Sequence, residues 1–286
     1  MDINEIRAAF LRSDTLIEEI KRFRTARIQK ISDYKPRLYL DRHLDNNAKT
    51  VIQLIPIDAF DHGRRYDNID ETIKFLYHDN GALKPMFRYK SGDPPLFLGF
   101  NDDIKLKINP EGIRKYSNFQ CYDADGRPYR EEYTYVQLFK NGIIEAVEQR
   151  ELNSIKDTKV LFEEYFQGLI DSLSNYLEAL KILDVAVPVY FFLTLLGVKD
   201  YRLYLGFREF EQKIGRDILA IPENIIRGDF IEKLDDKPEH ILKTYFDFIW
   251  NACGYPRCFY YDEEGNWTTK NTDKRIRDYI KASEIY

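Results

Sequence analysis

The chain has 286 residues, of which 44% are hydrophobic and 32% are charged. This composition predicts a soluble protein with a substantial core, in one large domain or two modest ones. The net charge of −5 excludes a general polycation. The longest apolar run, residues 185–198, is too short to span a bilayer, and the N-terminus lacks an apolar signal core. Three cysteines are too few for a disulfide framework, so we expect a cytoplasmic protein.

The N-terminal segment predicts two helices, residues 2–12 and 15–31, or one bent helix. Asp2 with Glu5, and Thr15 with Glu18, have the spacing of capping boxes. We therefore expect a helical segment over residues 1–32 within a single compact domain that spans residues 1–286.

A basic cluster lies on this N-terminal segment. No acid interrupts residues 21–31, whereas residues 1–50 as a whole carry 11 Lys and Arg against 8 Asp and Glu. On a helix, residues three apart are neighbours, so such a cluster would bind phosphates with an affinity that falls as salt rises. A solvated helix face is the alternative. The candidate nucleic-acid contacts are Lys21, Arg22, Arg24, Arg27 and Lys30.

The middle of the chain predicts strands. Residues 49–60 indicate a buried strand ending at Pro56, a short helix follows from Asn68, and residues 82–130 indicate loops and short strands. Residues 133–148 then predict a β-hairpin, because Asn141-Gly142 suits a type I′ turn between two apolar runs. Gln137 and Glu145 are the polar interruptions of these runs.

Residues 159–185 predict the clearest helix, with about three heptads of apolar residues. The pattern is typical of a core helix laid across a sheet, and the alternative is a homodimer seam over residues 162–183. Strands at 187–198 and 201–207, a helix at 240–253, a hairpin at 258–269 and a final helix at 272–285 follow. This alternation predicts an α+β fold with a mixed or antiparallel sheet packed by long amphipathic helices.

Metal and cofactor chemistry lacks its usual signals. None of the four histidines pairs at metal-ligand spacing, and no second pair of ligands accompanies Cys253 and Cys258. The glycine-rich phosphate loops and the serine nucleophile elbow do not occur, so we expect no cofactor and no metal. A metal-dependent nuclease remains an alternative, using Asp200, Glu211 and Lys213, or the charged loop at 58–67.

Several segments together carry a family resemblance. They are residues 3–28, "NPEGIRKYS" (109–117), "YTYVQLFKNGIIEAVE" (133–148), "VYFFLTLLGVKDYRL" (189–203) and "FIWNACGYPRCFYYDEEGNW" (248–267). In this order they resemble the C-terminal region of bacterial proteins with a DNA-binding domain of the Schlafen AlbA type. In that family the DNA-binding module precedes the region, whereas Met1 here sits almost at the junction. The family's DNA-binding, ATP-binding and nuclease activities therefore do not transfer directly, and no catalytic residue is carried over.

The expected function follows from this resemblance and from the basic cluster. We expect a non-catalytic accessory, regulatory or assembly domain that works with a nucleic-acid-binding AlbA-type module, in a defence-type context. A separate AlbA-type protein is then an expected partner, and the segment at 21–31 would share its nucleic-acid contacts. The nuclease and a structural homo-oligomer are the alternatives.

Overall fold

The computed structural model describes residues 3–34, 48–61, 83–86, 103–122, 127–149, 152, 159–203 and 225–283. Its centre is a seven-stranded sheet in the order β2-β3-β4-β5-β1-β7-β9, with every neighbouring pair antiparallel. The strands are β1 (Lys49–Pro56), β2 (Asp103–Asn109), β3 (Gly112–Tyr122), β4 (Pro128–Phe139), β5 (Ile144–Glu148), β7 (Val189–Leu196) and β9 (Ile225–Ile231).

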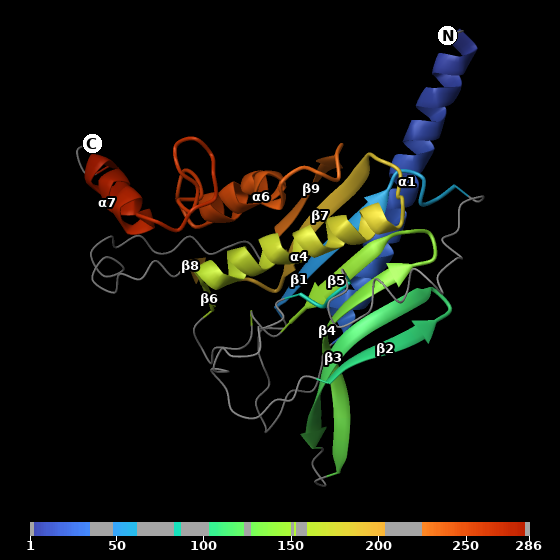
Figure 1. Cartoon of the computed structure of the whole chain (residues 1–286), viewed down its shortest axis with the longest axis horizontal. Helices are drawn as coiled ribbons and strands as arrows, with labels where there is room; N and C mark the ends of the chain where they lie inside the picture. The colour runs from blue at the N-terminus through green and yellow to red at the C-terminus, as the bar shows by residue number, and fades with distance from the viewer. Residues whose placement is uncertain are drawn as a thin grey trace.

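Helices cover both faces of this sheet (Figure 1). α4 (Glu163–Ile182) and α6 (Pro238–Ala252) pack on one face, and α1 (Ile3–Asp33) crosses the other. The first turns of α1 extend beyond the sheet, and α7 (Thr272–Ser283) lies at the far end of the molecule. The predicted α+β class is therefore confirmed. No helix within the described ranges combines the length and the apolar character that a bilayer crossing needs.

The apolar stripe of α4 faces inward. Phe166, Leu169, Leu173, Tyr176 and Leu180 are each fully buried within the chain, in one cluster with β1, β7 and α6. The core-helix interpretation is thus confirmed. These side chains are already covered by the sheet and by α6, so they favour the core helix over the alternative of a homodimer seam at 162–183. A homodimer stays an untested prediction.

The hairpin at 133–148 forms from β4 and β5, but its turn differs from the prediction. The main-chain N–H of Phe139 donates to the Ile143 carbonyl at 2.8 Å, and that of Gly142 donates to the Phe139 carbonyl at 3.0 Å. A positive φ occurs at Gly142 (81°) and not at Asn141. A type I′ turn needs positive φ at both central residues, so this is a three-residue loop that ends in a left-handed glycine.

Three further expectations are revised, namely the division of the N-terminal helix, the hairpin at 258–269 and the strand at 201–207. α1 is one continuous helix, and the expected hairpin at 258–269 is a single bridge between Tyr261 and Trp267. The expected strand at 201–207 contributes β8 (Arg202–Leu203), which pairs in parallel with β6 (Val160–Leu161) apart from the main sheet. β9 was not predicted. The short helix expected from Asn68 lies outside the described residues.

Candidate nucleic-acid interface

α1 is held on the sheet by apolar contacts between Leu16 and Ile31. Ile20 packs with Ile55 and Phe139, while Ile31 packs with Val51 and Val147. The helix therefore runs antiparallel to β1. At its C-terminal end the buried ammonium of Lys49 donates to the main-chain carbonyls of Ile31 and Tyr34, a favourable position for a cation because the C-terminal end of a helix carries partial negative charge.

Arg27 makes the strongest polar contact between α1 and the sheet. Its Nε and Nη2 donate to the two carboxylate oxygens of Glu145 at 3.0 and 2.6 Å, and both side chains are buried. Gln53 and Tyr135 also donate to this carboxylate, at 3.0 and 2.9 Å. Burial alone lowers the pKa of Arg27, but the hydrogen bond and charge of Glu145 outweigh it and raise the pKa. The Arg27 guanidinium therefore joins α1 to the sheet through buried contacts.

The other cations of the predicted cluster divide between the sheet and the solvent. Arg24 faces the sheet, where its guanidinium lies 4.3 Å from the Phe192 ring centre and donates to Thr194 at 2.9 Å. Burial lowers the pKa of Arg24. Lys21 and Arg22 are exposed and lie 2.8 and 3.9 Å from the carboxylates of Glu18 and Glu19.

Lys30 is also exposed, one turn after Arg27. The structure therefore does not place the five side chains on one solvent face. Nucleic-acid contact by Lys21, Arg22 and Lys30 stays a prediction, while Arg24 and Arg27 hold the helix to the sheet.

One row of cross-strand neighbours connects the buried pair to the far edge of the sheet. Each member lies opposite the next on the adjacent strand, and all share the α1 face because alternate residues of a strand share a face. In sheet order the row is Lys107, Arg114, Gln137, Glu145, Gln53, Phe192 and Gly228.

The β2 end of this row is basic and accessible. Along β3 the described side chains alternate between buried Ile113, Lys115 and Ser117 and half-buried Arg114 and Tyr116. On the half-buried side, β2 adds Lys105 opposite Tyr116 and exposed Lys107 opposite Arg114. We call Lys105, Lys107, Arg114 and Tyr116 the basic sheet face.

Arg114 is fixed in place within this face. Its guanidinium lies 4.0 Å from the ring centre of Tyr135, and its Nε donates to the Gln137 amide oxygen at 3.1 Å. The Asn109 amide donates to the same oxygen at 2.9 Å. The guanidinium is therefore held over an aromatic plane, opposite a second cation, Lys107. Two cations that lie opposite each other on one face can both contact the same anion.

The nuclease candidates are not brought together among the described residues. Asp200 is exposed with a φ of 66°, and its carboxylate lies 3.4 Å from the Lys159 ammonium. Glu211, Lys213 and residues 62–67 of the charged loop lie outside the described ranges. Within those ranges no group of three His, Cys, Asp or Glu side chains could hold a metal ion.

The basic sheet face was not predicted from the sequence. The signal that points to it is the alternation in "DIKLKIN" (103–109), in which lysines take every second position between Ile and Leu, as in a strand with one polar face. Gln137 and Glu145, which in the sequence are only polar interruptions of apolar runs, are the partners of Arg114 and Arg27.

Comparison with known proteins gives no relative. No protein-family model, no curated protein and no solved structure matches the chain. The resemblance to the Schlafen AlbA-type family therefore stays a prediction.

Proposed function

We propose that this chain is an accessory domain that contacts single-stranded nucleic acid through the basic sheet face and works beside a nucleic-acid-binding AlbA-type module. The proposal rests on one observation, the cross-strand pair of Lys107 and Arg114 with the neighbouring pair of Lys105 and Tyr116. These side chains lie on a face of the sheet that α1 leaves accessible at the β2 end.

The chemistry of this face suits a single strand. Lysine ammonium groups pair with phosphates, and a planar guanidinium or tyrosine ring offers a surface on which an unpaired base can stack. Arg114 supplies such a plane in a fixed orientation, because Tyr135 and Gln137 hold it. Exposed Lys30 on α1 is a fourth candidate cation for the same strand.

The docking of α1 supports the accessory role. A preceding module, joined to this helix or bound to it, would be positioned by a rigid connection, because the buried Arg27–Glu145 pair ties the helix to the sheet. In this proposal the domain extends the contact of its partner module along the strand, in the defence-type context that the resemblance implies.

Fluorescence anisotropy of labelled oligonucleotides tests the proposal. The intact chain is titrated against single- and double-stranded DNA and RNA of one sequence at low salt. We expect single strands to bind more tightly than duplexes. Lys105→Glu with Lys107→Glu should weaken binding at least about tenfold, because each lost phosphate contact is replaced by a repulsion.

The matched control is Lys270→Glu with Lys274→Glu, which makes the same charge change at exposed positions near and on α7. If the control weakens binding as much as the sheet variant, the contact is a general charge effect and the proposed face is refuted. Lys21→Glu with Arg22→Glu tests the outer side of α1 separately. Incubation with magnesium or manganese, followed by a gel, tests the nuclease alternative, and metal-dependent cleavage would replace the accessory role.

A further inference from the structure

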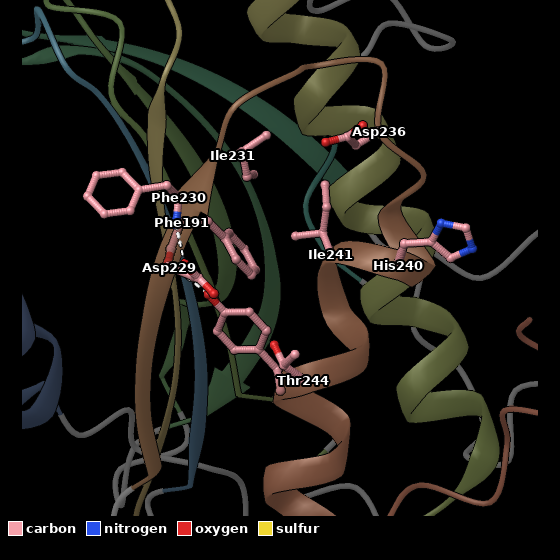
Figure 2. Close-up of a pocket in the computed structure, with 9 residues that line it drawn as sticks. Phe191, Asp229, Phe230, Ile231, Asp236, His240, Ile241 and Thr244 are labelled. Atoms are coloured by element: carbon pink, nitrogen blue, oxygen red, sulfur yellow. Dashed lines mark hydrogen bonds between the residues drawn. The ribbon is translucent and has the colours of Figure 1, made fainter. Parts of the chain in front are cut away.

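A second surface lies at the opposite edge of the sheet, where β9 has β7 as its one neighbour among the described strands. A cavity of about 380 Å³ opens between β9 and α6 (Figure 2). Its walls are Phe191, Ile231, Ile241 and Tyr245, and its polar lining comes from Asp229, Asp236, His240 and Thr244. An edge strand beside a helix, with a cavity between them, is the arrangement that accepts an added peptide strand.

The charged residues that line the cavity favour one kind of side chain in a bound peptide, namely a basic one. Asp229 and Asp236 contribute two carboxylates, and no lysine or arginine is present among the described lining residues. One oxygen of Asp229 accepts the main-chain N–H of Phe230 at 2.8 Å, which fixes the carboxylate beside the strand. A long apolar stem ending in a cation suits such a lining, because the stem packs on the walls and the charge meets the carboxylates.

The opposite face of β9 determines which side chains could flank that basic residue in a bound peptide. Phe230 also belongs to the cavity lining, but its ring points away from the cavity (Figure 2), is 50% exposed, and lies 4.3 Å from the Tyr190 ring. Two residues earlier, Gly228 lies under the ring of Phe192, so close that a Cβ there would lie 2.2 Å from a ring carbon. A strand paired with β9 would therefore meet an apolar, aromatic surface on this side.

We propose that the β9 edge binds an extended peptide from another protein, in which a lysine or arginine is flanked on both sides by apolar residues. The basic side chain would enter the cavity toward Asp229. Its two neighbours would point to the opposite face, because side chains alternate along a strand, and would pack on Phe230 and on Phe192 over Gly228. This site is independent of the basic sheet face.

The test uses labelled heptapeptides centred on Phe-Lys-Val and on its reverse, Val-Lys-Phe, since either strand direction is open to an edge. Binding to the intact chain is measured by anisotropy. We expect one of the two peptides to bind, Phe-Glu-Val to bind at least about tenfold more weakly, and N-methylation of the pairing amides to abolish binding, because it removes the main-chain donors.

Two variants complete the test. Asp229→Asn should weaken the lysine peptide about tenfold, with no effect on an otherwise identical peptide that carries norleucine. Asp235→Asn is the matched control, because that carboxylate pairs with Lys181 at 2.6 Å and does not line the cavity. Failure of both lysine peptides to bind at millimolar concentration, or binding insensitive to Asp229→Asn and N-methylation, would overturn the proposal. The proposal would also be overturned if sedimentation showed a homodimer of the chain and this dimer excluded the peptides from the β9 edge.

Discussion

At the scale of single residues, the arginines of α1 belong to the structure of the domain. Two arginines that look alike in the sequence are held by different contacts, one by a buried carboxylate and the other by an aromatic ring and a hydroxyl. Removing one member of a buried ion pair leaves the other charge without compensation, which costs more than the pair contributes.

Arg27→Met is therefore expected to lower the free energy of unfolding by about 3–5 kcal/mol, since Glu145 keeps a buried charge without its main partner. Adding Glu145→Gln to this variant should recover part of the loss, because the buried charge is gone. Urea unfolding followed by circular dichroism measures both. Arg22→Met, at an exposed position, is the control and should stay within about 0.5 kcal/mol of the parent. An Arg27→Met variant as stable as the control would show that the pair does not hold α1.

At the scale of secondary-structure elements, close approach of strands explains one glycine. A Cβ on Gly112 would lie 2.0 Å from the main-chain carbonyl oxygen of Leu138, on the neighbouring strand β4. The φ of 150° at this residue is also unfavourable for a residue with a side chain. The start of β3, which carries Arg114, therefore depends on the absence of a side chain two residues earlier.

Gly112→Ala should destabilise the domain by at least about 2 kcal/mol, because the clash is with backbone and cannot be relieved by a rotamer change. Gly265→Ala is the matched control, since it also has positive φ (83°) but its Cβ would meet its nearest atom, on Lys243, at 4.0 Å. It should cost about 1–2 kcal/mol from backbone strain alone. Equal losses in thermal unfolding would contradict the role assigned to the contact between β3 and β4.

The elements that could be predicted from the sequence are those with a strong local pattern. The heptads of α4 and the alternation at 133–148 give the right elements, because burial on one face imposes the period. β9 escaped prediction because "IIRGDFI" (225–231) contains Gly228 and Asp229, which are uncommon in strands. The position of Arg24 and Arg27 also escaped, because a cation that pairs with a distant strand looks the same in sequence as a solvated one.

At the scale of the whole molecule, the core contains several ionisable groups held neutral by burial. Burial raises the pKa of the Cys253 thiol to about 12 and raises the pKa values of Cys258, Tyr176, Tyr260 and Tyr261. In the unfolded chain the thiols ionise near pH 9 and the tyrosines near pH 10. Between the unfolded and folded pKa values, the unfolded state therefore binds fewer protons than the native state.

The sign of this linkage predicts alkaline unfolding. Below about pH 8 the buried thiols and tyrosines should not change the free energy of unfolding with pH. Above about pH 9 the free energy of unfolding should fall by about 1.4 kcal/mol per pH unit for each group that ionises in the unfolded chain. Urea titrations from pH 8 to 11 measure the slope. Cys253→Ala should reduce the slope by the contribution of one ionising group, about 1.4 kcal/mol per pH unit. A slope unchanged by this substitution would contradict the account of that thiol.

The nucleic-acid contact is the central claim at this scale, and the salt dependence of the affinity tests it most directly. Anisotropy with a single-stranded oligonucleotide is measured over a series of salt concentrations from about 20 to about 200 mM. Three phosphate contacts, from Lys30, Lys105 and Lys107, predict a slope of log K against log salt of about −2 for a single strand. Lys105→Glu with Lys107→Glu should make that slope shallower by about two thirds. A slope near zero, or one unchanged in this variant, would contradict the account.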